Sequence, residues 1–284
     1  MNVKEIGIIG AGTMGTGIAS VCALKGFKTT IYDINEQVLI KSHAVIFRGY
    51  DWLEEKKKVT RTEKSNAEKR LYFSSDINEI SGSHFIIEAA VENFDLKKVI
   101  YSQLDEITSD DAILASNTSS YSITALSSAI KNNRSRVIGM HFFNPANIMK
   151  LVEIVKGEFT SDDAVTKVIE FAGALGKTSV VCKDTPAFIV NRVARSFYGE
   201  ALKILGEENI DAETIDKIMM EEGGFKMGPF ELMDLIGIDV NYSVTKSVYE
   251  AFFHDSKYKP HPIQQKMVEA GMLGKKTGRG FYKY

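Results

Sequence analysis

Two ionisable side chains, His141 and Glu153, lie in consecutive apolar segments of the sequence, "VIGMHFF" and "LVEIV". Alternation along a strand places Glu153 on the same face as Leu151 and Val155. A carboxylate among apolar side chains needs a hydrogen-bonding partner if it is buried. An imidazole titrates in the range that suits a general base, and a carboxylate bonded to its other nitrogen fixes its tautomer. The pair could therefore take the proton of an alcohol while a hydride leaves for a cofactor.

Taken singly, neither residue requires this interpretation. His141 could be a structural histidine whose hydrogen bonds are satisfied, and Glu153 could face water from an edge strand. His141 is expected where its strand ends, just before Asn144-Pro145 breaks the chain. Ligands of open α/β sheets bind outside the carboxyl ends of the strands, so this position is a candidate site.

A glycine-rich segment of the GxGxxG type follows the first predicted strand and opens a helix pattern; it comprises Gly10, Ala11, Gly12, Thr13, Met14 and Gly15. Gly10 permits a tight turn, and Gly12 lets the backbone approach a pyrophosphate. Gly15 permits close packing of the helix on the strand, and the helix amino terminus faces the anion. The segment therefore predicts a dinucleotide site. The alternative is that the glycines only shape a turn.

Asp33 ends the second predicted strand, 18 residues after Gly15. A carboxylate at this position accepts hydrogen bonds from the adenosine ribose hydroxyls and repels a 2′-phosphate, which predicts NAD rather than NADP as the cofactor. The alternative is that Asp33 merely caps the helix that follows.

Strand-length apolar segments alternate with helix patterns up to Asp184. The predicted strands are VKEIGIIG, KTTIYD, SHFIIEAA, AILASN, RVIGMHFF, LVEIVKG and TSVVCKD. Helix patterns lie between most of them, notably at residues 95–107 and 162–175. This alternation predicts an α/β protein with a doubly wound, mostly parallel Rossmann-type sheet covered by helices on both faces.

Two features divide the chain. Residues from about 35 to 71 form a charged helical excursion that contains "EEKKK". After "KDTPAF" the strand patterns stop, and Thr185-Pro186 supplies a capping residue followed by proline at a first helical position. The sequence therefore predicts an NAD-binding domain over residues 1–184 and a smaller all-helical domain over residues 185–284.

The composition of the 284 residues excludes several classes of protein. A net charge of -2 and a pI near 6.3 argue against a nucleic-acid partner. Cys22 and Cys182 lack the spacing of a metal site, and two thiols are too few for a disulfide framework, so no metal and a reducing, cytoplasmic compartment are expected. The sequence contains no apolar run of membrane-spanning length and no secretory signal, so no membrane partner is expected.

The sequence resembles the 3-hydroxyacyl-CoA dehydrogenases from end to end, and in length the stand-alone 3-hydroxybutyryl-CoA dehydrogenases. The motifs that carry the resemblance are GAGTMGTGIA, IIEAAVEN, ASNTSS, MHFFNPANIMKLVEIV, CKDTPAFIVNR, MGPFELMDLIGID and GKKTGRGFYKY. The resemblance implies reversible, NAD-dependent oxidation of an (S)-3-hydroxyacyl-CoA thioester to the 3-oxoacyl-CoA. It also implies a homodimer formed through the helical domain.

The resemblance assigns roles to individual residues. It implies that His141 is the general base, that Glu153 orients it and that Ser120 binds the 3-oxygen of the substrate. Asn191 would reach the same site from the helical domain, and Asn144 would lie in the same pocket.

Further residues resemble positions that meet NAD and the coenzyme A part of the substrate. Glu92 and Lys97 match positions near the nicotinamide half of NAD, and Asn117 lies near it. Lys56 and Lys58 are the nearest matches to the coenzyme A contact. Each role has an alternative: Ser120 could cap a helix that begins near Tyr121, Asn191 could be an ordinary exposed residue, and the lysines could be a solvated face.

The sequence departs from the family pattern at two positions and leaves two rival functions open. Ala187 stands where the family usually has glycine, and Lys57, the middle lysine of "EEKKK", replaces another usual glycine. A dehydrogenase of free 3-hydroxy acids would carry a lysine base in the region "FIVNRVARSF", which has none. A non-catalytic NAD-binding protein would have no need of the four residues His141, Glu153, Ser120 and Asn191 together.

Overall fold

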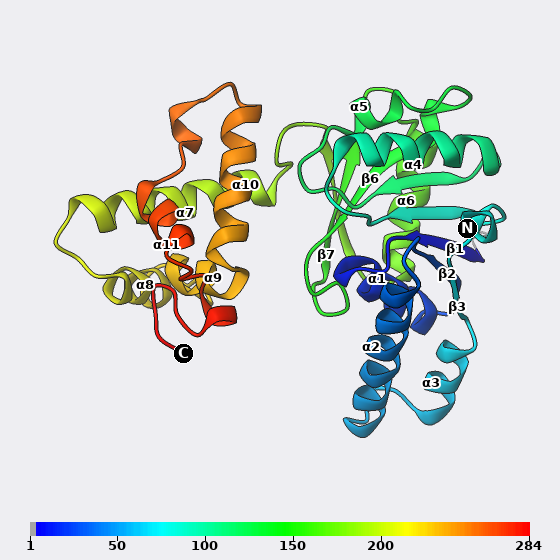
Figure 1. Ribbon diagram of the computed structural model, residues 1–284, viewed down its shortest axis with the longest axis horizontal. Coiled ribbons are helices and arrows are strands. Elements are labelled where there is room, and N and C mark those ends of the chain that lie inside the picture. The colour runs from blue at the N-terminus through cyan, green and yellow to red at the C-terminus, as the bar shows by residue number, and fades with distance from the viewer. Residues whose placement is uncertain (1–3) are drawn as a thin grey trace. The chain divides into compact units, whose positions relative to one another are not determined.

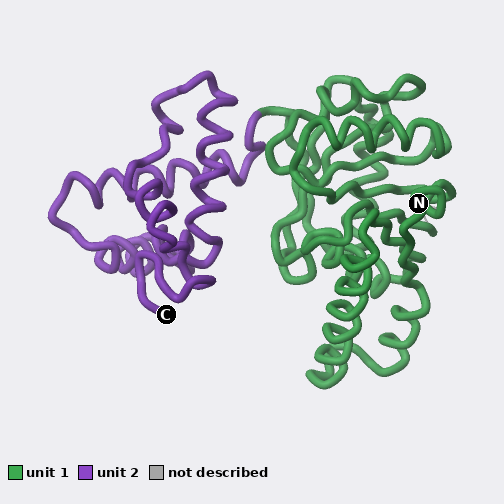
Figure 2. Tube along the Cα trace, in the orientation of Figure 1, with its two compact units in different colours: residues 1–185 green, residues 186–284 purple. Residues whose placement is uncertain are grey.

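The computed structural model describes residues 4–284. The chain forms two compact units, and the division falls between Thr185 and Pro186 (Figure 2). The first unit is built around an eight-stranded sheet, and the second is built of helices (Figure 1).

The first unit alternates strands and helices along the chain. Its elements are β1 (Glu5–Ile9), α1 (Thr13–Leu24), β2 (Lys28–Tyr32), α2 (Glu36–Glu55), α3 (Arg61–Glu68), β3 (Leu71–Ser74), β4 (Phe85–Glu88), α4 (Phe94–Ile107), β5 (Ile113–Ser116), α5 (Ile123–Ser127), β6 (Val137–Phe142), β7 (Leu151–Lys156), α6 (Asp162–Ala174) and β8 (Thr178–Lys183). Short 3-10 helices lie at Ile77–Ile80 and Arg134–Arg136.

The strand order is β3-β2-β1-β4-β5-β6-β7-β8. The first six strands are parallel, β7 runs antiparallel to β6, and β8 runs parallel to β7. The order reverses between β1 and β4, which is the switch point where doubly wound sheets bind ligands at the strand carboxyl ends. The predicted doubly wound, mostly parallel sheet is confirmed.

Helices cover both faces of this sheet. One buried cluster joins α1, α2 and α6 to strand residues such as Ile8, Ile87 and Ala115. Ile86 and Leu114 are equally buried but do not belong to that cluster. Because successive strand side chains point to opposite faces, Ile86 and Leu114 point to the second face of the sheet. Helices α4 and α5 cover that face.

One strand, β3, was not predicted from the sequence. It pairs with β2 at the edge of the sheet, and only Leu71 of its four residues is buried. A short, half-exposed edge strand has no continuous apolar pattern, so no strand was predicted directly after the helical excursion, which was expected to end at about residue 71. The excursion itself is α2 and α3, which connect β2 to β3.

The second unit has a core of its own. Its helices are α7 (Val190–Glu207), α8 (Ala212–Glu221), α9 (Pro229–Ile236), α10 (Ile238–Ala251) and α11 (Pro262–Glu269), with 3-10 helices at Ser256–Tyr258 and Lys275–Thr277. Tyr198, Leu202, Phe230, Met233 and Ile238 are among the residues that form the core. Within residues 4–284, no helix has both the length and the apolarity to cross a bilayer.

The first helix of this unit begins later than predicted, at Val190 rather than Pro186. Ala187 and Phe188 have φ angles of 62° and 50°, in the left-handed region. This region costs an ordinary L-residue about 1–2 kcal/mol, and two such residues interrupt any helix begun at the proline. Glycine adopts the same φ without that cost, which explains its preference at position 187.

The closing motif of the chain has a structural role. Asp234, which is buried, accepts hydrogen bonds from the backbone N–H groups of Phe281 and Tyr282, both at 3.0 Å. Asp216 accepts one from the Tyr282 hydroxyl at 2.7 Å. A Cβ at Gly280 would lie 2.0 Å from Asp234 Oδ1, so only glycine fits at this contact. The tail is thereby fixed to α8 and α9.

Candidate active site

His141 and Glu153 contact each other. They are register partners in the antiparallel pair β6–β7, so their side chains lie on the same face of the sheet. His141 Nδ1 lies 2.7 Å from Glu153 Oε2. His141 is 6% exposed and Glu153 is fully buried. Because β7 lies between β6 and β8, Glu153 is not on an edge strand.

This geometry defines the chemistry of the imidazole. A carboxylate at Nδ1 accepts the Nδ1–H hydrogen bond and balances the charge of the ring when it is protonated. A buried imidazolium without such a partner would be costly. The His141–Glu153 pair can therefore accept a proton and release it.

Ser120 and Thr118 follow β5 and are held by Glu92. Ser120 Oγ donates to Glu92 Oε1 at 2.9 Å, and Thr118 Oγ1 donates to the same oxygen at 2.5 Å. The helix that follows, α5, is capped by Ser122. Ser120 is therefore not the capping residue that the alternative interpretation proposed.

A buried ionic cluster lies behind Glu92, and its member Glu88 was not predicted from the sequence. Lys97 Nζ is 2.5 Å from Glu88 Oε1 and 3.2 Å from Glu92 Oε2. Glu88 Oε2 also accepts from Ser116 Oγ at 2.6 Å. The signal for Glu88 was present in the sequence, since "FIIEAA" places a carboxylate at the end of an apolar strand, as "LVEIV" does for Glu153.

Two asparagines lie near the end of β6. Asn117 Oδ1 accepts a hydrogen bond from the backbone N–H of Phe142 at 2.9 Å, which ties the ends of β5 and β6 together beside His141. Asn144 is exposed and precedes a cis peptide bond to Pro145. Asn191 belongs to the other unit, where it lies half-buried in the first turn of α7.

A cleft of about 780 Å³ opens at the carboxyl ends of β1, β2 and β4. Gly10, Gly12, Thr13, Met14 and Asp33 all line it, together with the apolar side chains of Val91, Leu96 and Val99. The volume lies within the usual range for ligand sites.

The three glycines of the GxGxxG segment differ in their surroundings. Gly10 has φ +92°, and a Cβ there would lie 2.7 Å from the Ala89 carbonyl oxygen. A Cβ at Gly15 would lie 1.8 Å from the Gly10 oxygen, whereas a Cβ at Gly12 would meet nothing within 4 Å. Gly10 and Gly15 are therefore needed by the fold. Gly12 leaves open space beside the amino terminus of α1, where a pyrophosphate fits.

Asp33, which directly follows β2, holds the backbone of the glycine-rich segment and of residue 35 in place. Its Oδ2 accepts from the backbone N–H of Ala11 at 2.8 Å, and its Oδ1 accepts from that of Asn35 at 2.9 Å. The cap of α2 is Asn35, whose side chain accepts from Gln37. Asp33 is therefore not the helix cap of the alternative interpretation, and each carboxylate oxygen retains acceptor capacity toward a ribose.

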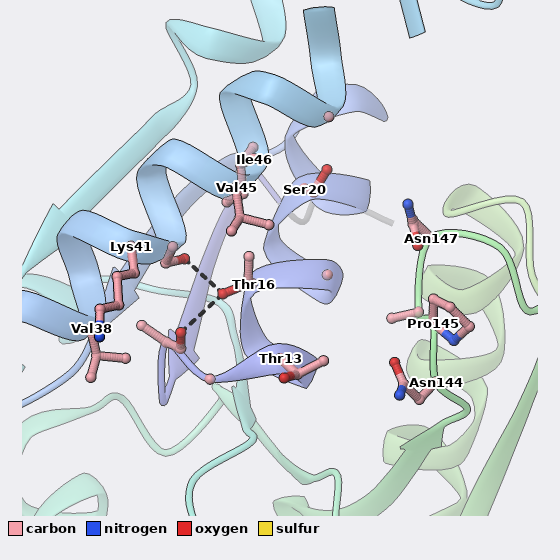
Figure 3. A pocket seen from close by; sticks show the side chains of 16 residues that line it. Thr13, Thr16, Ser20, Val38, Lys41, Val45, Ile46, Asn144, Pro145 and Asn147 are labelled. Carbon is pink, nitrogen blue, oxygen red and sulfur yellow. Dashed lines mark hydrogen bonds between the residues drawn. The ribbon is translucent and has the colours of Figure 1, made fainter. Parts of the chain in front are cut away.

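A second pocket, of about 490 Å³, lies beside the first (Figure 3). Its walls are α1, α2 and the segment 144–147, and Figure 3 shows Lys41 and Val45 of α2 across α1 from Asn144 and Asn147. Thr16 Oγ1 and Ser42 Oγ lie 2.8 Å apart and join the two helices. Lys41 was not predicted as a site residue, because a single lysine in a charged helix pattern does not indicate a ligand site.

The lysines of "EEKKK" lie at the far end of α2. Lys56 is the C-cap residue, and Lys58 Nζ lies 4.9 Å from the centre of the Trp52 ring. All three lysines are exposed, and no carboxylate pairs with them among residues 4–284. Glu54 instead pairs with Lys64.

Neither cysteine is suited to nucleophilic chemistry. Burial raises the pKa of Cys22 to about 12. Burial and the nearby carboxylates of Glu153 and Asp184 raise the pKa of Cys182 to about 12. Both thiols remain protonated at neutral pH, and only the thiolate is an effective nucleophile.

Two family profiles match the chain and cover nearly all of it. Residues 5–185 match "3-hydroxyacyl-CoA dehydrogenase, NAD binding domain", and residues 188–284 match "3-hydroxyacyl-CoA dehydrogenase, C-terminal domain".

Individual proteins are similar over the same length. The chain is 43% identical to a 3-hydroxyadipyl-CoA dehydrogenase of Escherichia coli over 99% of its own length, but spans only 59% of that protein. It is 40% identical to a probable 3-hydroxybutyryl-CoA dehydrogenase of Deinococcus radiodurans, covering 99% of this chain and 100% of that protein. A solved (S)-3-hydroxybutyryl-CoA dehydrogenase of Ralstonia eutropha superimposes with a TM-score of 0.95 at 40% identity, covering 100% of this chain and 99% of the other.

Proposed function

The chain belongs to the 3-hydroxyacyl-CoA dehydrogenase family, and from that premise we propose that it catalyses the reversible, NAD-dependent oxidation of an (S)-3-hydroxyacyl-CoA to the 3-oxoacyl-CoA. The observation that carries the proposal is the buried contact of 2.7 Å between His141 and Glu153. Two of the relatives are named as 3-hydroxybutyryl-CoA dehydrogenases, one of them as a probable one, and a third is named as a 3-hydroxyadipyl-CoA dehydrogenase. The 3-hydroxybutyryl thioester is the substrate proposed here.

His141 is the general base in this proposal. Its Nε2 takes the proton of the substrate hydroxyl, and Glu153 stabilises the imidazolium that forms. Ser120 holds the 3-oxygen, and Asn144 lies in the substrate pocket. The role expected for Asn191 stays a prediction. NAD, when bound, supplies the hydride acceptor.

The cofactor site rests on the glycine segment and Asp33. Gly12 has open space where a Cβ would stand, and Thr13 and Met14 begin the helix whose amino terminus attracts a pyrophosphate. Asp33 accepts the ribose hydroxyls and repels a 2′-phosphate. Glu92, Lys97 and Asn117 serve the nicotinamide half.

The pocket beside α1 and α2 suits the pantetheine arm of a thioester. It is lined by Asn144 at one side and extends along α2 as far as Gly49. Lys56 lies seven residues beyond Gly49, or about 10 Å along the helix. An arm that leaves the pocket in that direction reaches Lys56 and Lys58, which are exposed cations suited to nucleotide phosphates.

The test is NADH oxidation with acetoacetyl-CoA, compared with free acetoacetate, by the purified full chain. Turnover with the thioester alone supports the proposal. Turnover with the free acid at equal or greater kcat/KM would favour a 3-hydroxy acid dehydrogenase. NADH binding without turnover of either would favour a non-catalytic NAD-binding protein. His84→Ala, an exposed histidine before β4, is the matched control for His141→Ala.

A homodimer and a cytoplasmic location accompany this proposal. The second unit exposes apolar side chains on adjacent helices, at Ile218, Leu235, Ile236 and Val240. A second copy of the chain would cover such residues. The two free, protonated thiols suit a reducing compartment.

A further inference from the structure

The only tryptophan of the chain, Trp52, lies on the surface of the last turn of α2. Its side chain is 49% exposed. The next residue, Leu53, packs against the buried cluster of the first unit, so this turn is anchored to the core without Trp52. A single exposed apolar residue is ordinary on a protein surface. The position of Trp52 along α2 is what gives it meaning.

Trp52 continues the face of α2 that lines the second pocket. Val45 and Gly49 belong to the wall of that pocket. Trp52 follows Val45 by seven residues, so the two side chains leave the helix within about 20° of each other. Side chains of a helix lean toward its amino terminus, which directs the Trp52 ring toward the turn of Gly49. A Cβ at Gly49 would meet nothing within 4 Å, so the surface between the pocket and the ring is open.

The chain reversal after α2 brings a cation onto the ring. Lys57 has a φ of 54°, in the left-handed region, and the backbone N–H of Lys58 donates to the Leu53 carbonyl at 2.8 Å. The reversal returns Lys58 over the last turn, where its Nζ lies 4.9 Å from the centre of the Trp52 ring. Lys56 follows Trp52 by four residues and lies on the same side of the helix. The end of α2 thus combines one aromatic ring with two ammonium groups.

The acidic residues of the last turns do not neutralise these ammonium groups. Asp51 and Glu54 both pair with Lys64 instead. Glu55 is the neighbour of Lys56 in the sequence, so its side chain leaves the helix about 100° away from that lysine. An aromatic face beside cations suits a nucleotide, because a base stacks on the ring while the cations attract the phosphates.

We propose that Trp52 stacks on the adenine base of the coenzyme A thioester and is thereby a specificity-determining residue. The inference rests on the proposed function, in which the pantetheine arm occupies the second pocket. An arm that leaves this pocket past Gly49 crosses open surface and brings the nucleotide to the last turn of α2. There the adenine covers the Trp52 ring, and Lys56 and the flexible, exposed Lys58 meet the phosphates. Substrates without the nucleotide gain nothing from this ring.

The fluorescence of Trp52 reports directly on this contact, because the chain has no second tryptophan and a stacked base quenches indole emission. Coenzyme A and adenosine 3′,5′-bisphosphate should quench the emission of the full chain to saturation, whereas pantetheine should not. NAD should leave the emission unchanged, since Trp52 does not line the dinucleotide cleft. No quenching by millimolar coenzyme A would overturn the proposal.

Substitution separates stacking from the neighbouring charges. Trp52→Leu should raise KM for acetoacetyl-CoA roughly 5- to 10-fold without changing kcat, the lower end of the effect of a stacked base because the ring is half exposed. Trp52→Phe, which keeps an aromatic face, should recover most of this loss. The matched control is Phe159→Leu, since the Phe159 ring is also 49% exposed and lies 5.4 Å from the Arg134 guanidinium. Its KM should equal that of the wild type.

The salt dependence and the substrate provide two further checks. The increase in KM should persist at physiological salt, because stacking is not screened as charge pairs are. An increase that disappears with salt would show that Trp52 only positions Lys58, and would overturn the proposal. Acetoacetyl-pantetheine should give equal KM values for Trp52→Leu and the wild type, and unequal values would also overturn it.

The two readouts distinguish this inference from the proposed function. Turnover of acetoacetyl-CoA without quenching, and with wild-type KM in Trp52→Leu, would overturn the role of Trp52 and leave the dehydrogenase intact. Saturable quenching by coenzyme A in a chain that turns over no thioester would support the role of Trp52 and contradict the dehydrogenase.

Discussion

At the scale of the residue, the site depends on charges that the fold has paired. Glu153 and Glu88 are both buried carboxylates on strands, and each has one cationic or protonatable partner, His141 and Lys97 respectively. A buried charge left alone costs several kcal/mol. Removing one partner of either pair therefore changes both the chemistry and the local structure.

His141→Ala should lower kcat by roughly 10²- to 10⁴-fold, the usual contribution of a positioned acid or base, because the proton of the substrate hydroxyl loses its acceptor. NADH affinity, measured by fluorescence titration, should stay near the wild-type value. Glu153→Gln should also be slow and should change the pH–rate profile, because the imidazolium loses its balancing charge. A folded His141→Ala enzyme with near-normal turnover would rule out the assignment.

Gly12 and Gly15 provide a matched pair of substitutions. Gly12→Ala should leave Tm almost unchanged but weaken NAD binding roughly tenfold or more, since the added methyl group occupies only the space for the ligand. Gly15→Ala should lower the free energy of unfolding by about 1–3 kcal/mol, because its Cβ would stand 1.8 Å from the Gly10 oxygen. Calorimetry measures both quantities. Equal NAD affinity in Gly12→Ala would show that the dinucleotide does not approach there.

Asp33→Ser should weaken NAD binding and relax the discrimination against NADP, because repulsion of a 2′-phosphate is removed. The loss of NAD affinity should exceed the contribution of the ribose contact alone, since the backbone N–H of Ala11 also loses its hydrogen-bond acceptor. The ratio of kcat/KM for the two cofactors checks the prediction. An unchanged ratio would mean that Asp33 only organises the loop.

At the scale of the element, α2 connects the two candidate ligand sites. Its amino-terminal turns line the dinucleotide cleft through Val38, its middle lines the second pocket through Lys41 and Gly49, and Lys56 caps its end. One helix of 20 residues can thus contact a substrate along about 30 Å. The position of a lysine along α2 decides which part of the substrate it can reach.

The double substitution Lys56→Ala with Lys58→Ala should raise KM for acetoacetyl-CoA several-fold at low ionic strength. The effect should shrink toward physiological salt, where the Debye length is about 8 Å. A pantetheine thioester, which lacks the nucleotide phosphates, should not distinguish the variant from the wild type. Lys167→Ala, at a partly exposed position of α6, is the control. Equal KM values at low salt would show that the lysines are a solvated face.

At the scale of the whole molecule, the two units have separate cores and different tasks. The sheet unit contains the pair His141–Glu153 and both pockets, and the helical unit contains Asn191. The helical unit also exposes apolar side chains on α8, α9 and α10, which are the surface of the proposed dimer.

Sedimentation velocity at micromolar concentration should give a particle of twice the chain mass, because the exposed apolar residues of the helical unit are buried by a second copy. Ile236→Asp should shift the population toward the monomer, whereas Val181→Asp, at a comparably exposed apolar position on β8 of the other unit, should not. A monomeric wild type would contradict the proposed dimer.

Much of the fold followed from local patterns in the sequence. The glycine segment, the seven predicted strands and the end of the strand patterns after Asp184 are signals in which neighbouring residues determine a conformation. The missed features are β3, whose edge position removes the apolar pattern, and the start of α7, where Ala187 and Phe188 adopt left-handed φ angles. The periodicity of apolar residues in the sequence does not indicate either feature.

The contacts of the site belong to tertiary structure. His141 and Glu153 meet because β7 turns antiparallel to β6 in one particular register, and a slip of one residue would send Glu153 to the other face. Lys97 meets Glu88 for the same reason. Covalent geometry determines which residues of one segment share a face, so a sequence shows that much. Which segments become neighbours depends on packing of the whole chain, and only the folded structure shows it.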